Sequence, residues 1–423
     1  MYDRSHDKNG LTTVVSRMPG MQSVSLGVWI GVGGRNESRS ESGISHLIEH
    51  MLFKGTVSRT AKDLKEAIEG VGGMFNGFTS DEVTCYMVKV PAAYMDLGLD
   101  VLSDMVMNPR FDKDDLVKEK YVVMEEIKMY RDQPSEHVLD VLGELMWPDH
   151  PLGRPLTGTV STVRALTMDD MVAYKERFYH PGNISVIAAG NVSPDKLFRS
   201  AAERFSGRKG GRAYGINTPK KFVKGPRMKV VSDDTQQNHI AIGFRCVGDT
   251  LEERFAAKMM NVILGGNMSS RLFEELREKY GLCYDISSSY KRHSDIGELQ
   301  VHAGVDPGKT LKSIRAILDE LKKIKDLGVT AEELDRAKRY AQGQFVLAME
   351  GTSTRMMWLG DRQVVHKEIP EVKEVLRRIE EVTPRQIQRV SEKIFSPGNL
   401  NLALVGRINA SERSSIKKEL SKI

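Results

Sequence analysis

The sequence contains little cysteine and no long apolar run. Its 423 residues include three cysteines, whose spacing fits neither a disulfide framework nor a cysteine metal site, so a reducing compartment is expected. No apolar run approaches the ~18–20 residues that span a bilayer, and we expect no membrane span. The N-terminal residues MYDRSHDKNG have neither the apolar core of a signal peptide nor the arginine-rich, acid-poor character of a transit peptide.

Charge of either sign is only in small excess. The net charge is +5, and no dense basic patch with interleaved aromatic residues occurs, so a nucleic-acid partner is not expected. Apolar residues make up 40% of the chain and charged residues 28%, which is typical of a soluble globular protein. A chain of 423 residues is too long for one ordinary core, and two or more domains are expected.

A repeated motif divides the chain into two halves. The stretch FYHPGNISV at 178–186 returns as IFSPGNLNL at 394–402, with the Pro-Gly pairs 216 residues apart. Each copy predicts a helix, a Pro-Gly turn and an apolar strand, so the fold class is α+β with an internal duplication. We expect halves at 1–205 and 227–423, joined by a polar, glycine-rich linker at 206–226.

The most informative pattern is the sequence His46-Leu47-Ile48-Glu49-His50, which occurs only in the first half. Residues at i and i+4 share a helix face, so His46 and His50 can bind one metal ion with Glu49 beside it. Zinc hydrolysis needs neutral nitrogen ligands, an open position for water, and a carboxylate that takes the proton of the water. A surface helix with solvated histidines is the alternative. Flanking apolar residues at helical spacing instead predict a mostly buried helix, on which imidazoles need partners.

A third ligand is expected on a second helix, predicted over residues 113–131. Glu119 and Glu126 are seven residues apart and share a face of this helix, whereas Glu125 lies roughly 100° round from Glu126. A carboxylate pair on a half-apolar face indicates one ligand and one supporting residue. An ordinary solvated face with Glu–Lys pairs is the alternative.

With these residues the chain resembles the pitrilysin family of zinc peptidases, and within it the catalytic β-subunit of the mitochondrial processing peptidase and its bacterial homologues. The family carries a glutamate at a set distance after the second histidine, where Glu126 lies 76 residues beyond His50. The resemblance implies one Zn²⁺ per chain on His46, His50 and Glu126, with Glu49 as general base and Glu119 in support. It also implies two similar α/β-roll halves that enclose a cavity.

Other stretches resemble the substrate-binding segments of this family. Residues 72–79, GGMFNGFT, resemble the edge strand that holds a peptide by strand addition, with Asn76 as a contact. From the residues alone, an ordinary hairpin is equally acceptable. Phe53 matches a residue that lines the pocket after the scissile bond, although a lone aromatic also suits a core. In the second half, Arg277 and Tyr284 match a pair that approaches the bound peptide; a surface arginine and a core tyrosine are the alternative.

Two acidic residues follow at helical spacing, Glu136 and Asp140. In processing peptidases, acidic residues at matching offsets receive an arginine of the substrate, and a carboxylate pair suits a guanidinium group. Solvated helix charges are the alternative.

Together these features predict a zinc endopeptidase that cleaves extended peptides or presequence-like segments, with arginine-directed cleavage as the finer expectation. The alternative is a non-catalytic or scaffold subunit of a processing-peptidase-like complex, against which the intact motif argues. A zinc hydrolase acting on other substrates is a third possibility, which the edge-strand resemblance disfavours. The resemblance further implies a homodimer, or a heterodimer with a related subunit. It places the protein in a bacterial cytoplasm, or in the mitochondrial matrix as a mature chain.

Overall fold

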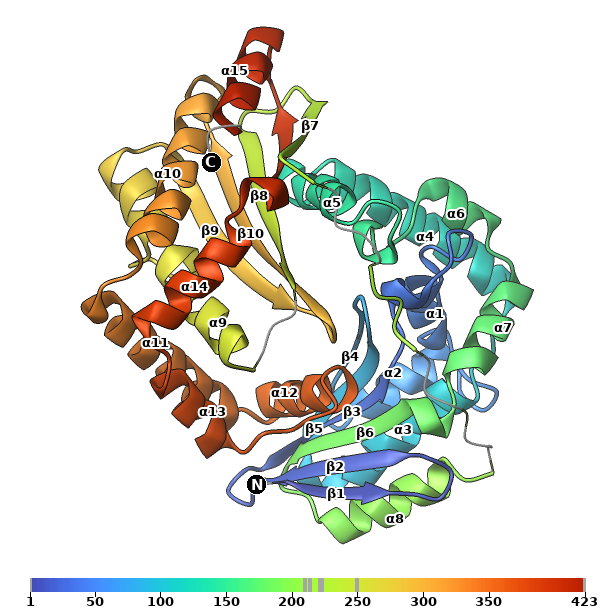
Figure 1. Ribbon diagram of the computed structural model, residues 1–423. Helices are drawn as coiled ribbons and strands as arrows, with labels where there is room; N and C mark the ends of the chain where they lie inside the picture. Colours follow the sequence, from blue (N-terminus) through green and yellow to red (C-terminus); the bar gives the residue numbers. More distant parts are fainter. Residues whose placement is uncertain (1, 208–210, 212–214, 220–223, 248–250, 421–423) are drawn as a thin grey trace. The chain divides into compact units, whose positions relative to one another are not determined.

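The chain forms two compact units, each built on one mixed sheet (Figure 1). The computed structural model describes all residues except 1, 208–210, 212–214, 220–223, 248–250 and 421–423. Unit 1 comprises Met1–Lys128, Arg154–Asn217 and Val346–Glu371, and unit 2 comprises Met129–Gly153, Thr218–Phe345 and Val372–Ile423. The predicted α+β class and the division into two similar halves are confirmed.

The sheet of unit 1 has six strands in the order β1-β2-β6-β3-β5-β4. Strands β2 and β6 run parallel, and the other neighbours are antiparallel. The strands are β1 Asp3–His6, β2 Thr12–Arg17, β3 Ser23–Ile30, β4 Met74–Thr79, β5 Thr84–Pro91 and β6 Ile184–Gly190. The helices are α1 Ile44–Leu52, α2 Ala61–Glu69, α3 Met95–Met107, α4 Lys113–Arg131, α6 Val160–Ala165, α7 Met168–Phe178, α8 Pro194–Arg204 and α12 Thr352–Val364, with the last three residues of α4 counted in unit 2.

The sheet of unit 2 has five strands in the order β7-β11-β8-β10-β9, with β7 and β11 parallel and the other pairs antiparallel. Its strands are β7 Arg227–Ser232, β8 Asn238–Val247, β9 Cys283–Arg292, β10 Ile296–Val305 and β11 Asn401–Gly406. Its helices are α5 Pro134–Met146, α9 Leu251–Gly265, a π-helix Phe273–Lys279, α10 Thr310–Leu327, α11 Ala331–Glu350, α13 Val372–Glu380, α14 Pro384–Ile394 and α15 Ala410–Leu420, with the last five residues of α11 counted in unit 1.

The two sheets correspond strand by strand once β1 is set aside. The order β2-β6-β3-β5-β4 corresponds to the order β7-β11-β8-β10-β9, and the parallel pair occupies the same position in both sheets. Pro181–Asn183 forms a 3-10 turn between α7 and β6, and Pro397–Asn399 forms the same turn between α14 and β11. The helix, turn and strand predicted for each copy of the repeat are thus present in both halves.

The two halves exchange one helix each. Helix α5 lies in the first half of the sequence but packs on β8 and β11 of unit 2, and α12 from the second half packs on β3 and β6 of unit 1. The exchanged helices meet equivalent glycines, 216 residues apart. A Cβ on Gly27 would lie 2.9 Å from Sδ of Met356, and one on Gly243 would lie 2.3 Å from Sδ of Met146. The duplication therefore includes the contact between sheet and exchanged helix.

The compact units consequently depart from the boundaries expected at 1–205 and 227–423. Residues 129–153 belong to unit 2 and residues 346–371 to unit 1. The apolar stripe of an amphipathic helix shows that it covers a sheet but does not say which sheet, so the exchange leaves no mark in the sequence pattern. Much of the expected linker 206–226 lies outside the described residues.

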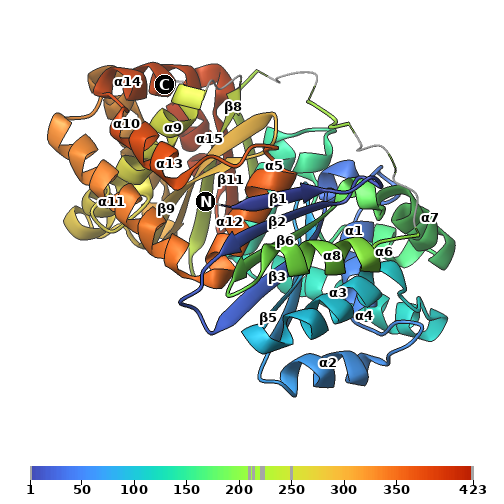
Figure 2. The ribbon, with the colours of Figure 1, turned by 90° about the horizontal axis from the view of Figure 1, so that it is seen from below.

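Helix α12 covers one face of the unit 1 sheet, while α3 and α8 cover the other (Figures 1 and 2). Its apolar side chains, including Met356 and Leu359, are buried with Trp29 of β3. At its N-terminal end, the hydroxyl of Ser25 on β3 donates to the hydroxyl oxygen of Thr352 over 2.9 Å. Burial of this cluster holds the segment of the second half in unit 1.

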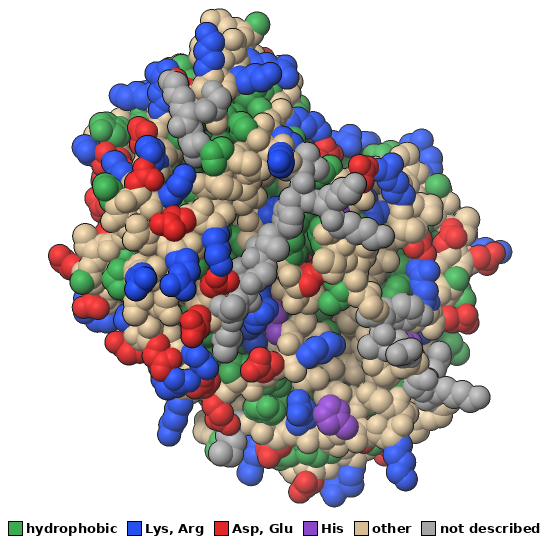
Figure 3. All heavy atoms as spheres, viewed as in Figure 1, with side chains coloured by type: hydrophobic (Ala, Val, Ile, Leu, Met, Phe, Trp, Pro, Cys, Tyr) green, Lys and Arg blue, Asp and Glu red, His purple; other side chains and the backbone are tan. Residues whose placement is uncertain are grey.

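The surface mixes charges of both signs. Figure 3 shows lysine and arginine interspersed with aspartate and glutamate over the visible face, without a large area of one sign. Among the described residues, no helix combines the length and apolar character required to cross a membrane.

The contact between α12 and Trp29 leads to a stability prediction. A Cβ on Gly360 would lie 2.1 Å from Cε2 of Trp29, inside a rigid indole ring, so we expect Gly360→Ala to destabilise the protein by about 1–3 kcal/mol. Gly343 is the matched control, since it is helical and exposed and its Cβ would meet nothing within 4 Å. Gly343→Ala should stabilise by about 0.5–1 kcal/mol. Urea denaturation of both variants measures the difference, and equal midpoints would contradict the packing.

Candidate active site

Helix α1 presents the two histidines of the motif on its less buried side. Ile44, Leu47, Ile48, Met51 and Leu52 are buried in the core of unit 1, which fixes the opposite side of the helix. The rings of His46 and His50 lie one turn apart with centroids separated by 4.7 Å. The helical spacing predicted from the sequence is confirmed.

Glu126 of α4 meets these histidines, and Figure 1 shows α1 and α4 next to each other. Its Oε2 lies 3.7 Å from Nε2 of His46 and 3.7 Å from Nε2 of His50. A tetrahedral zinc ion with bonds of about 2.1 Å separates its ligand atoms by roughly 3.4 Å. Among the described residues this is the only group of three His, Cys, Asp or Glu side chains close enough to share a metal ion. Two imidazoles and a carboxylate are a donor set that suits zinc.

Glu119 fixes the orientation of His50. Nδ1 of His50 donates to Oε2 of Glu119 over 3.1 Å, which leaves Nε2 as the free lone pair toward Glu126. Oε1 of Glu119 pairs with Nζ of Lys54 at 2.6 Å. Burial alone would raise the pKa of Glu119, but these two partners lower it, so the carboxylate stays charged. The face shared by Glu119 and Glu126, predicted from their spacing, is present.

Glu125, the neighbour of Glu126 on α4, does not take part in the cluster. Glu125 is exposed and pairs with Lys128 at 2.6 Å, away from the histidines.

Burial, together with the neighbouring His50, lowers the pKa of His46 to about 4, so its imidazole is neutral as a metal ligand must be. Nδ1 of His46 is buried and has no hydrogen-bond partner among the described residues.

Glu49 lies beside the cluster and is held by the edge strand. Its Oε2 accepts a hydrogen bond of 2.6 Å from the hydroxyl of Thr79, the last residue of β4. Burial raises the pKa of Glu49 and outweighs this hydrogen bond, which acts in the opposite direction. A carboxylate with a raised pKa is suited to accept a proton near neutral pH.

Strand β4 is the outer strand of the unit 1 sheet, as expected for residues 72–79. It pairs with β5 alone among the described strands, so its other edge offers backbone groups for an added strand. The side chain of Asn76 is exposed, and its Oδ1 accepts from the amide of Gly77 over 2.8 Å. Phe53 is the C-cap residue that follows α1, and it packs against Phe75 of β4, with ring centroids 4.8 Å apart.

In unit 2, Arg277 and Tyr284 lie together. Arg277 belongs to the π-helix, and its guanidinium carbon stacks over the rings of Tyr284 at 4.9 Å and Phe273 at 4.6 Å. Tyr284, on β9, is 76% exposed, which does not fit a core tyrosine. A π-helix often marks a functional segment, because its extra residue per turn displaces the side chains around it.

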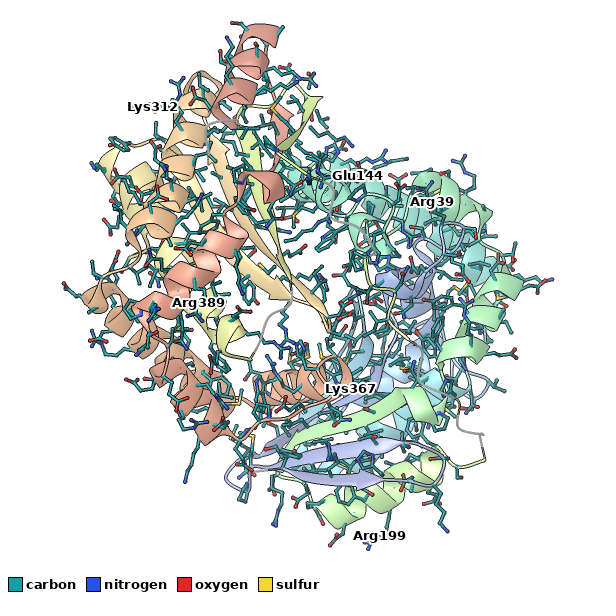
Figure 4. All side chains as sticks on the ribbon, in the orientation of Figure 1. Arg39, Glu144, Arg199, Lys312, Lys367 and Arg389 are labelled. Carbon is teal, nitrogen blue, oxygen red and sulfur yellow. The ribbon has the colours of Figure 1, made fainter. Side chains whose placement is uncertain are left out.

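Glu136 and Asp140 lie in unit 2 on successive turns of α5. Burial and the nearby charges of Glu144 and Glu136 raise the pKa of Asp140 to about 6. Glu144, labelled in Figure 4, lies on the same helix and pairs with Lys229. Asp140 is therefore close to two other carboxylates, and a cation bound beside it would reduce the repulsion between their charges.

Sequence reasoning missed Thr79 and Lys54. Thr79 is far from the motif in sequence, and only the folding of β4 against α1 brings its hydroxyl to Glu49. Lys54 follows His50 by four residues, which could have indicated a shared side, but α1 ends at Leu52. Contacts of this kind depend on how the chain packs beyond a helix end.

Comparison with known proteins agrees with this geometry. Residues 12–160 match the family described as insulinase, peptidase family M16, and residues 165–340 match the peptidase M16 inactive domain. A protein of Mycobacterium bovis named as an uncharacterized zinc protease is 36% identical over 92% of this chain and 89% of its own length. The uncharacterized zinc protease YmxG of Bacillus subtilis is 33% identical over 94% of this chain and 96% of its own length.

A solved structure shows the same fold. The protease from Helicobacter pylori is 24% identical to this chain and superposes with a TM-score of 0.90, covering 96% of this chain and 99% of its own. A duplicated α+β fold with an H-x-x-E-H helix and a glutamate on a second helix is that of the inverted-motif zinc peptidases. The chain belongs to peptidase family M16, and the predicted pitrilysin-type relationship is confirmed.

The expected metal ligands can be tested with neighbouring glutamates on one helix. Glu126→Gln should lower zinc affinity by about 100-fold or more, because two histidines alone hold zinc weakly. Glu125→Gln changes the same charge one residue away and should leave zinc affinity unchanged. Metal content after dialysis against a chelator series measures both. Equal affinities for the two variants would remove Glu126 from the site.

Proposed function

We propose that this protein is a zinc-dependent endopeptidase. One observation carries the proposal: one ligand atom from each of His46, His50 and Glu126 lies within 4.8 Å of the others, and the motif carboxylate Glu49 lies beside them. The names of the relatives as zinc proteases support zinc as the metal and peptides as the substrate.

In this proposal each side chain has one task. When bound, zinc would polarise a peptide carbonyl and lower the pKa of a water molecule at the site. Glu49 takes the proton from that water and returns it to the leaving amine. The hydroxyl of Thr79 donates to Oε2 of Glu49, and the other carboxylate oxygen is proposed to take the proton. Glu119 keeps His50 in the tautomer with a free Nε2.

The proposed substrate is an extended peptide that adds to the open edge of β4. Main-chain hydrogen bonds would then bind peptides of many sequences, with Asn76 and Phe53 as side-chain contacts from unit 1. Arg277 and Tyr284 are the proposed contacts from unit 2, where a guanidinium can donate to a carbonyl and a phenol can donate to a developing oxyanion.

Arginine-directed cleavage is the finer part of the proposal. Glu136 and Asp140 would receive a substrate guanidinium, and the raised pKa of Asp140 supports an acidic site without its counter-charge. The non-catalytic alternative is disfavoured, since the motif is intact and its ligands are assembled. A homodimer, or a heterodimer with a related subunit, and a cytoplasmic location complete the proposal.

The role of Glu49 separates catalysis from metal binding. Glu49→Gln should keep zinc, because Glu49 is not among the three converging ligands, and should lower kcat/KM by about 10²–10⁴-fold. Digestion of a peptide library followed by mass spectrometry gives both the rate and the cleavage sites, with Glu125→Gln as the active control. Full activity of Glu49→Gln would overturn the base assignment. Failure of the zinc-loaded wild type to cleave any peptide would favour the non-catalytic alternative.

Asp140 gives a prediction for pH. Its folded pKa of about 6 lies above its ordinary value of 3.8, so the folded state favours the protonated form, and that stabilisation is lost as pH rises from 3.8 through 6. At pH 8, Asp140→Asn should therefore be more stable than the wild type by about 1–3 kcal/mol, after allowance for partial exposure. The difference should vanish below about pH 4. Urea denaturation at several pH values measures it, and an unchanging difference would contradict the account.

In the peptide-library digest, loss of arginine enrichment near the sites that the Asp140→Asn variant cleaves would support the binding of a substrate arginine by Asp140. Unchanged enrichment would reject it and leave the zinc chemistry intact.

A further inference from the structure

The N-terminus of the motif helix has no cap of its own. Gly43 is the N-cap residue of α1, with a φ of 92°, and no side chain within the helix accepts its first amides. The first amides of a helix need acceptors, and an uncapped end opens easily. Since His46 lies in this first turn, the end of α1 bears directly on the proposed metal site.

The carboxylate of Glu37 supplies the missing cap from six residues upstream. The amide of Gly43 donates to Oε2 over 2.8 Å, and the amide of Ser45 donates to Oε1 over 2.9 Å. Both carboxylate oxygens thus accept a hydrogen bond, and the residue is only 4% exposed. A negative charge at this end also interacts favourably with the helix dipole. Burial outweighs these contacts and raises the pKa of Glu37 to about 7.

The surrounding chain holds Glu37 in place. Arg154 donates to the carbonyl oxygens of Glu37 and Ser38, at 2.6 Å each. Arg39, labelled in Figure 4, follows in the same loop. On the helix side, a Cβ on Gly43 would lie 2.6 Å from the carbonyl oxygen of Thr157, so only glycine allows this close approach. The cap therefore belongs to a packed arrangement and not to a mobile loop.

The two histidines differ in how they are fixed. His50 is oriented by its hydrogen bond to Glu119, whereas the buried Nδ1 of His46 has no partner among the described residues. The position of the His46 imidazole is then set by the backbone of the first helical turn. That turn is held at Ser45, the residue before His46, by the carboxylate of Glu37.

We propose that Glu37 is a positioning residue that sets the place of His46 relative to His50 and Glu126. It touches neither metal nor substrate and acts through the amides of Gly43 and Ser45. The inference rests on the proposed zinc site, and it adds a residue that the motif does not contain. Replacing Glu37 by Gln keeps the shape but turns an amide NH₂ toward one of the two backbone donors.

The test compares Glu37→Gln with Thr60→Ala at pH 8, above the pKa of about 7 for Glu37. Thr60 caps α2 in the same unit by accepting from the amide of Asp63 over 3.1 Å, and this cap serves a different helix from that of the motif. Zinc affinity of each metal-free protein is measured by competition with a chromogenic chelator. We expect Glu37→Gln to bind zinc about 10–100-fold more weakly and Thr60→Ala to bind like the wild type.

The absorption spectrum of bound cobalt gives a second readout, which a loss of protein stability alone would not change. The visible absorption of protein-bound Co²⁺ depends on ligand geometry, so it should change in Glu37→Gln and stay unchanged in Thr60→Ala. If Glu37→Gln fails to fold, Glu37→Asp keeps the charge with a shorter reach and should show an intermediate loss of affinity. Wild-type affinity and spectrum in the folded Glu37 variant would overturn the positioning role. A wild type that binds no zinc would instead overturn the proposed function.

Discussion

The structure depends on one convergence, in which a carboxylate from α4 meets two imidazoles from α1. Glu126 lies 3.7 Å from Nε2 of both His46 and His50, and all three side chains are largely withdrawn from water. Polar groups placed in this way cost free energy unless they have partners. The core side of α1 must therefore be anchored well enough to hold them, and the apolar residues of the motif helix provide that anchor.

The duplication gives the site a rigid frame. The unit 1 sheet supports α1 and α3 on one face and receives α12, from the other half of the chain, on the opposite face. In unit 2, α5 packs on the sheet in the same way. In both units a methionine sulfur of the exchanged helix lies over an equivalent glycine, Gly27 or Gly243. Because each half completes the core of the other unit, neither half of the sequence forms its unit alone. Only one half carries the motif, so the repeated fold serves a single candidate site.

Sequence patterns predicted the features that depend on local periodicity. The helix of His46 and His50 and the shared face of Glu119 and Glu126 follow from spacing, whereas the edge position of the strand before β5 was expected from the family resemblance. The exchange of α5 and α12 could not be predicted, since amphipathicity does not specify which sheet a helix covers. The contact of Thr79 could not be predicted either, because it forms only when β4 packs on α1. Glu37 is near α1 in the sequence, but its cap depends on the conformation of the loop between them, which no spacing rule specifies.

The most direct measurement is X-ray absorption spectroscopy at the zinc edge of the metal-loaded protein, together with the stoichiometry of bound metal. The account predicts one zinc per chain with two imidazole nitrogens and the remaining ligands oxygen, at about 2.0–2.2 Å, and no sulfur. The same signal should disappear when His46 and His50 are both replaced. Sulfur ligation, or full zinc binding without the two histidines, would contradict the assignment of the site to α1 and α4.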